Sequence, residues 1–129
     1  MKDIIFDNFQ NDVNESLLRH RSILDIITKL TEANARVNRA VVKSVTTCGC
    51  IKISAKKQGN LDNINELNPS LSNDIEGKLC KNCRDIIESE IGNNIFYLTS
   101  LCNCLDLNLY DILLKEEDKI NILGKYTFR

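Results

Sequence analysis

Residues 88–114 read ESEIGNNIFYLTSLCNCLDLNLYDILL and carry the strongest pattern in the chain. Apolar side chains recur there at three- and four-residue steps, the spacing of one face of an α-helix. That apolar row consists of Ile87, Ile91, Ile95, Leu98, Cys102 and Leu105. Beside it, at the same spacing, lie Ile86, Glu90, Asn93 and Tyr97. The pattern predicts a long helix with a packed apolar face and a carboxylate and an amide next to it.

Asn108 interrupts this pattern and begins a second one. Its side-chain oxygen can accept a hydrogen bond from the first turn of a following helix, which makes it a typical N-cap. Gly124 is a natural residue to follow the end of that helix. The stretch therefore predicts two consecutive helices that meet in a tight hairpin.

Two further amphipathic helices are predicted upstream. The first has the apolar stripe Ile5, Phe6, Phe9, Val13 and Leu17. The second opens at Ser22 and has the seam Ile23, Ile27, Leu30, Asn34, Val37 and Val41. We expect Asn34 to bond to a neighbouring helix, because a buried amide needs a partner. Four such helices predict an all-α bundle.

Residues 46–73 break the helical pattern and contain Gly49, Gly59 and Pro69. Ile51 and Ile53 alternate with polar residues there, which favours a short strand. We therefore expect one helical domain spanning residues 1–129, with a connecting loop at 46–73. The two long apolar seams exceed what four short helices cover, so we expect homo-oligomerisation to complete the core.

The whole-chain composition excludes several classes of protein. The 129 residues include 17 basic and 18 acidic side chains, so no overall positive field favours generic nucleic-acid binding. No window approaches the roughly 20 apolar residues that span a bilayer, and the N-terminal residues do not resemble a signal peptide. We expect a cytoplasmic protein that binds no membrane.

The six cysteines include a C-x-C at Cys48 and Cys50 and a C-x-x-C at Cys80 and Cys83. Without a secretion signal, such a set favours metal binding over disulfides. Four thiolates can close a tetrahedral site around zinc, which would clip the two ends of the long loop together. Reduced thiols and a redox dithiol are the alternatives. Cys102 and Cys104 point to different helix faces and are assigned to packing.

The order Glu-Ile-Gly-Asn-Asn-Ile-Phe-Tyr-Leu followed by Leu-Asp-Leu-Asn-Leu-Tyr-Asp-Ile-Leu resembles the second half of the MazG-like nucleoside triphosphate pyrophosphohydrolases. The resemblance implies an all-α bundle that forms dimers or tetramers. It also implies carboxylates on facing helices that hold magnesium while water attacks a triphosphate.

Laid on this chain, the family's acidic motifs retain only Glu32 and Glu90 as candidate catalytic acids. Ala33, Arg36 and Asn93 stand at three positions where the family holds metal ions. Two carboxylates are too few to neutralise a pair of magnesium ions, so a magnesium cofactor is doubtful on these residues. We predict instead that Arg36 replaces the metal as the positive charge facing Glu90.

Arg36, Arg39 and Lys43 share one helix face, which suits a phosphate-bearing ligand such as a nucleotide. Together with Asn93 of the later helix, they are the candidate ligand-binding residues. A solvated basic face is the alternative. His20 lies between two arginines, and we expect a surface or junction residue rather than a catalytic base.

Two functions follow from these residues. The first is a zinc-stapled binding or structural module that has lost metal-dependent hydrolysis and recognises a nucleotide or a partner protein. The second is an active pyrophosphohydrolase that converts a nucleoside triphosphate to the monophosphate and pyrophosphate. It would use Glu32 and Glu90 with other acids, such as Asp85 or Glu88, in a rearranged magnesium site. Because only two of the family's acids are retained, the residues favour the binding or structural module.

Overall fold

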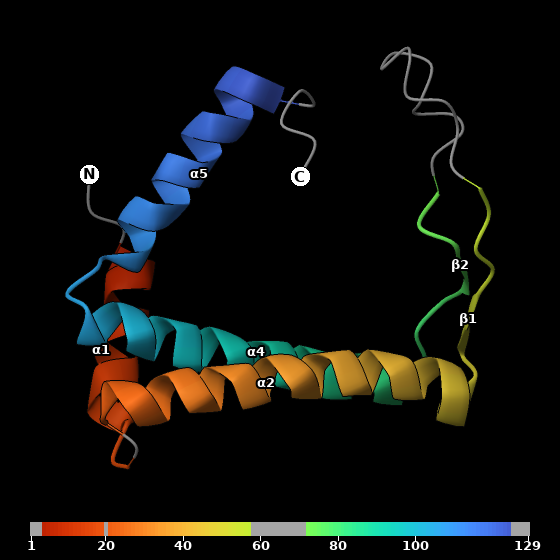
Figure 1. Cartoon of the computed structure of the whole chain (residues 1–129), viewed down its shortest axis with the longest axis horizontal. Coiled ribbons are helices and arrows are strands. Elements are labelled where there is room, and N and C mark those ends of the chain that lie inside the picture. Colours follow the sequence, from red (N-terminus) through yellow and green to blue (C-terminus); the bar gives the residue numbers. More distant parts are fainter. Residues whose placement is uncertain (1–3, 20, 58–71, 125–129) are drawn as a thin grey trace. The chain divides into compact units, whose positions relative to one another are not determined.

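The structure is a computed structural model that describes residues 4–19, 21–57 and 72–124. The described chain is mainly helical, as expected, with four α-helices and one two-stranded sheet (Figure 1). The helices are α1 (Ile4–Ser16), α2 (Ile23–Lys43), α4 (Lys81–Cys104) and α5 (Leu109–Leu123). A π-helical turn, η1 (Ser44–Cys48), follows α2, and the strands are β1 (Ile51–Ile53) and β2 (Ile75–Gly77). His20 and residues 58–71 of the predicted loop lie outside the described residues.

The chain divides into two compact units. The first consists of residues 1–34 and 91–129, and the second of residues 35–90. Helices α2 and α4 each contribute one part to either unit.

The helix boundaries follow the capping residues in the sequence. Ser22 precedes α2, and its hydroxyl accepts a hydrogen bond from the Leu24 N–H at 3.2 Å. Asn108 caps α5, because its side-chain oxygen accepts from the Asp111 N–H at 2.9 Å. Helix α5 ends at Leu123, directly before Gly124. The predicted starts of α2 and α5 and the predicted end of α5 are therefore confirmed.

In the first unit, Gln10 ties α1 to the connection between α4 and α5. Its amide donates to the Leu107 carbonyl at 2.7 Å and accepts from the Leu109 N–H at 2.9 Å. Asn103 donates in turn to the Gln10 carbonyl at 3.0 Å. These bonds join residues more than ninety positions apart. One of them satisfies the Leu109 N–H, a group that the first turn of α5 leaves without a partner within the helix.

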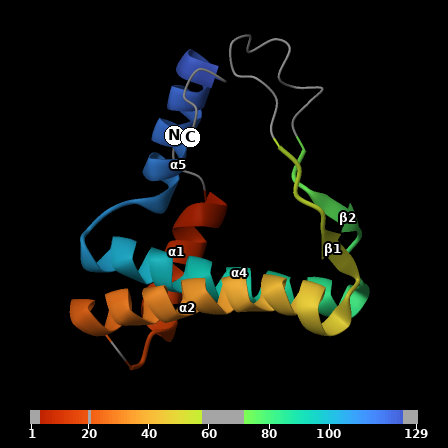
Figure 2. The ribbon, with the colours of Figure 1, turned by 45° about the vertical axis from the view of Figure 1, so that its right-hand side comes forward.

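In the second unit, β1 and β2 form an antiparallel ribbon between η1 and the start of α4 (Figure 2). The register pairs Ile51 with Gly77 and Ile53 with Ile75. The strand predicted at Ile51 and Ile53 is confirmed. Its partner β2 was not predicted, because residues 75–77 show no alternating pattern; α4 begins after this strand, at Lys81.

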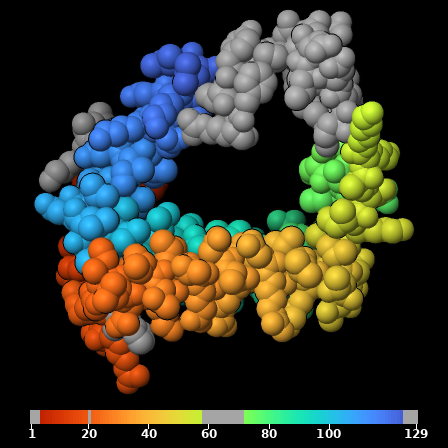
Figure 3. Space-filling model, in the orientation of Figure 1, coloured from red at the N-terminus to blue at the C-terminus, as the bar shows by residue number. Residues whose placement is uncertain are grey.

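The predicted seam of α2 is in part wrong. Ile23, Ile27 and Val41 are exposed, and so is Asn34. The inner face of α2 instead carries buried Ile26 and Ala33, with half-buried Leu30, Val37 and Ala40, and buried Ser44 follows in η1. Small side chains such as Ala33 therefore occupy buried positions of α2, and several bulky aliphatic residues occupy exposed ones. Figure 3 shows the outer face of α2 uncovered along its length.

The predicted stripe of α4 is only partly buried. Ile87 and Cys102 lie in the core, with 8% and 4% of their surface exposed. Ile91, Ile95 and Leu98 are 40–43% exposed, and Leu105 is 50% exposed. Cys83 and Thr99 join the buried set. The predicted helix is therefore confirmed, but its buried side includes residues outside the predicted stripe.

None of the described helices combines the length and the apolar character that a membrane span requires.

Candidate functional site

The second unit brings together the four cysteines predicted as metal ligands. The sulfur atoms of Cys48, Cys50, Cys80 and Cys83 all lie within 4.8 Å of one another. The first two follow α2 through η1, and the last two stand at the start of α4. Strands β1 and β2 pair between the two cysteine pairs, and this pairing brings the chain after Cys50 close to the chain before Cys80.

Gly49 gives the C-x-C pair its turn. Its φ angle is 79°, in the left-handed region that residues with a side chain rarely adopt. Its N–H donates to the Ser44 carbonyl at 2.9 Å and closes the last turn of η1. The chain therefore reverses between Cys48 and Cys50, and both thiols reach the same cluster.

Gly77 allows the ribbon to approach the second cysteine closely. It pairs with Ile51, and a Cβ atom built on it would lie 2.7 Å from the Cys50 carbonyl oxygen. Its φ angle is also positive, at 87°. Any larger residue here would push β2 away from Cys50 or strain the backbone that leads to Cys80.

The spacing of the four sulfurs is compatible with a structural zinc site. Four sulfurs at about 2.3 Å from a central ion lie about 3.8 Å from one another. The Cys48 and Cys80 sulfurs are 3.8 Å apart, and the whole set is contained within 4.8 Å. Cys83 is buried, Cys50 and Cys80 are half-buried, and Cys48 is exposed. The cluster is thus compact enough to hold one ion.

The thiols perturb one another electrostatically. The Cys83 N–H donates to the Cys80 sulfur at 3.4 Å, and this bond is the main cause that lowers the pKa of Cys80 to about 7. A hydrogen bond from Ser44 favours the Cys83 thiolate, but the neighbouring sulfurs and burial outweigh it and raise the pKa of Cys83 to about 12. Deprotonation of one thiol therefore disfavours deprotonation of its neighbour. A cation at the centre would relieve the repulsion between thiolates.

The other two cysteines lie in the first unit. Cys102 is buried, and burial raises the pKa of its thiol. This agrees with its assignment to packing. Cys104 is exposed at the end of α4, so packing does not account for it.

The predicted ion pair between Arg36 and Glu90 is confirmed. The Arg36 Nε donates to Glu90 Oε2 at 3.2 Å, joining α2 to α4 within the second unit. Glu32 is exposed in the first unit and pairs with Lys29 at 3.7 Å. Asn93 is exposed and belongs to the first unit as well. The structure therefore groups Glu90 with Arg36 and leaves Glu32 and Asn93 in the other unit.

Arg36, Arg39 and Lys43 line one cavity of about 380 Å³ in the second unit. Ala40, Ile86 and Glu90 complete its wall. The predicted basic face of α2 is therefore a concave surface. Asn93, the fourth predicted ligand-binding residue, does not line it.

Sequence reasoning missed Ser44 and Gly77. Ser44 is 1% exposed, donates to the Ala40 carbonyl at 3.1 Å and offers its own carbonyl to the Cys50 thiol. A signal for Gly77 was present, because an isolated glycine three residues before a C-x-x-C motif suggests close backbone approach. No comparable signal marked Ser44.

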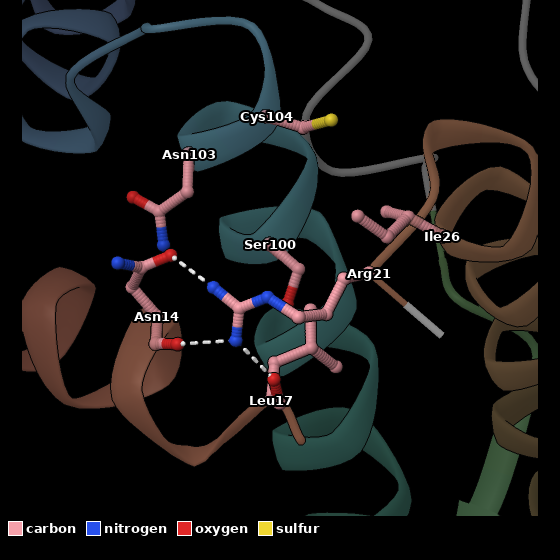
Figure 4. Close-up of a pocket in the computed structure, with 7 residues that line it drawn as sticks. All are labelled: Asn14, Leu17, Arg21, Ile26, Ser100, Asn103 and Cys104. Atoms are coloured by element: carbon pink, nitrogen blue, oxygen red, sulfur yellow. Dashed lines mark hydrogen bonds between the residues drawn. The ribbon is translucent and has the colours of Figure 1, made fainter. Parts of the chain in front are cut away.

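The first unit contains a smaller cavity of about 110 Å³ beside Arg21 (Figure 4). The Arg21 guanidinium donates to the backbone carbonyls of Asn14 and Leu17 and to the Asn14 side chain. Figure 4 shows these bonds around one end of α1. Arg21 therefore caps the C-terminal carbonyls of α1, and its contacts are structural.

Comparison of the sequence with protein-family models and with curated proteins, and of the structure with solved structures, finds no match.

Proposed function

We propose that the chain is a zinc-stapled binding module that has lost the metal-dependent hydrolysis of the MazG-like enzymes it resembles. The observation that carries this proposal is the convergence of four cysteine sulfurs within 4.8 Å. A structural zinc there would join the C-terminal end of α2, the ribbon and the start of α4 with four protein ligands and no open position. Such a closed site stabilises the fold and does not itself carry out catalysis.

The position of Arg36 argues against hydrolysis by the usual magnesium mechanism. Magnesium is held by carboxylate oxygens, and a guanidinium within hydrogen-bond distance of Glu90 occupies the place that a cation would take. Ala33 contributes no oxygen from its side chain, and it is 1% exposed. Binding without turnover fits these residues better than a rearranged catalytic site.

We further propose that the exposed aliphatic residues of α4 pack against a second copy of the chain. Ile91, Ile95 and Leu98 lie at helical spacing, and each is at least 40% exposed. A dimer or tetramer would remove this surface from water. Light scattering on the zinc-loaded protein tests the proposal, and a monomer at high concentration would contradict it. We place the protein in the cytoplasm, where thiols remain reduced and free to bind metal.

Two measurements on one preparation test the function. Elemental analysis should find one zinc per chain, and a panel of nucleoside triphosphates with magnesium should yield no pyrophosphate. Pyrophosphate release that disappears in Glu90→Ala would instead establish a hydrolase. Asn93→Asp is the matched variant, because it restores the family's acid. New magnesium binding by this variant would indicate a catalytic scaffold that lacks one ligand.

A further inference from the structure

A second cavity of about 180 Å³ adjoins the basic cavity in the second unit. Both cavities are lined by Ala40, Lys43 and Ile86, so they meet at one shared wall. The second one extends towards the metal cluster and includes Cys48 and Cys83 in its lining. The two cavities are therefore neighbours, and we call the pair the groove; its lining includes Arg36 at one end and Cys48 and Cys83 at the other.

The first cavity is cationic. Arg36, Arg39 and Lys43 face a single carboxylate, that of Glu90. Arg36 is engaged by Glu90, but within the described chain no hydrogen bond or ion pair of the Arg39 or Lys43 side chain occurs. Arg39 and Lys43 are thus two cations of this lining that Glu90 does not engage. A phosphate monoester, which is close to a dianion at neutral pH, has the charge to balance them.

The second cavity is more suited to an apolar group. The Ala40 and Ile86 side chains contribute to it, and Cys83 is buried at its edge. Its volume slightly exceeds the roughly 150 Å³ of a cavity that accommodates benzene. The first cavity, at about 380 Å³, falls within the range of roughly 300–1,000 Å³ that small-molecule sites occupy.

We propose that this groove binds a phosphate monoester carrying a single aromatic ring. Arg39 and Lys43 hold the phosphate, and Arg36 adds positive charge while it remains paired with Glu90. The ring enters the second cavity against Ala40 and Ile86. The inference rests on the proposed zinc site, because Cys48 and Cys83 form part of that wall and the metal would fix their positions.

Calorimetry on the full zinc-loaded chain tests this with two probes, phenyl phosphate and inorganic phosphate. Phenyl phosphate should bind at least tenfold more tightly, because only it fills the second cavity. Arg39→Gln and Lys43→Gln should each weaken both probes by roughly tenfold or more, since each loses a charged hydrogen bond to the phosphate. Equal affinity for the two probes, or unchanged affinity in both variants, would overturn the proposal.

Two further variants make the test specific. Thr47 lines the second cavity but not the basic one, so Thr47→Leu should remove the advantage of phenyl phosphate and preserve binding of inorganic phosphate. Arg84→Gln removes an exposed cation of α4 that lines neither cavity, and it should bind both probes as the wild type does. Zinc content is measured on every sample. Absence of zinc contradicts the proposed function, whereas zinc-loaded protein that binds neither probe contradicts the groove alone.

Discussion

Arg36 and Glu90 form an ion pair between two helices, with Nε and Oε2 3.2 Å apart. The Arg36 side chain is 58% exposed and the Glu90 side chain 23%, so water screens the attraction between them. We expect a double-mutant cycle with Arg36→Gln and Glu90→Gln to give a coupling of about 0.2–1 kcal/mol in the free energy of unfolding. Urea denaturation provides the measurement. A coupling of several kcal/mol would show that the pair is far more shielded than its exposure indicates.

Removal of zinc should destabilise the protein strongly. Apparent binding free energies of structural zinc are about 10–16 kcal/mol at neutral pH, so a strong chelator withdraws a large part of the folding free energy. Cys83→Ser and Cys80→Ser should each lower zinc content and the melting temperature. Cys104→Ser is the matched control, because this thiol is exposed and lies outside the cluster. Identical melting curves with and without chelator would exclude a structural metal.

Gly77→Ala should separate the ribbon from the cysteines. The new Cβ would meet the Cys50 carbonyl at 2.7 Å, and the φ angle of 87° disfavours any side chain. We expect a loss of about 1–3 kcal/mol in stability together with weaker zinc binding. Gly92→Ala is the control, since a Cβ there meets nothing within 4 Å. Equal zinc affinity in Gly77→Ala would mean that the ribbon does not position the ligands.

In the reduced, zinc-free protein, Cys80 should be the most reactive thiol of the cluster. Its pKa is lowered to about 7 and that of Cys83 is raised to about 12. The Cys80 thiolate is therefore present above pH 7 and disappears as the pH falls below it, whereas Cys83 stays protonated throughout. Mass spectrometry after brief iodoacetamide labelling at several pH values reports each site. Preferential labelling of Cys83 at pH 8 would contradict this order, and zinc should protect both residues.

Asn108→Ala should destabilise α5 and its attachment. The side chain caps the helix through the Asp111 N–H and also donates to Asp7 at 3.2 Å. Loss of such an N-cap costs about 0.5–2 kcal/mol. Asn108→Ser retains an oxygen for the cap, so thermal denaturation should place its stability between wild type and Asn108→Ala. If both variants lose the same amount of stability, the loss would come from the hydrogen bond to Asp7 and not from the cap.

Local chemistry made much of this fold predictable. Ser22, Asn108 and Gly124 act within a few residues of their own position, so the sequence was sufficient to locate the helix ends they define. The cysteine spacing likewise predicted four ligands from two local turns. The Arg36–Glu90 pair needed a resemblance that aligned the two helices, because the residues lie 54 positions apart.

The remaining features depend on packing between distant segments. The period of α2 predicts a helix, but the side that packs depends on where small residues such as Ala33 permit contact. Strand β2 was missed because Ile75–Gly77 has no pattern of its own and pairs only when β1 is beside it. The basic cavity was missed as a concave site because it also requires Ile86 and Glu90 from α4.

Gly77 lies close to the Cys50 carbonyl at the base of the ribbon, where the strands meet the four cysteines. The two strands are therefore held together at this end. Loop-closure entropy grows slowly, by only about 0.6 kcal/mol for each doubling of length. Because strand pairing and the cysteines hold this base, a peptide added between Ile53 and Ile75 would raise the closure cost only slightly. An insertion there should therefore leave the pairing of Ile51 with Gly77 and the positions of the four thiols unchanged.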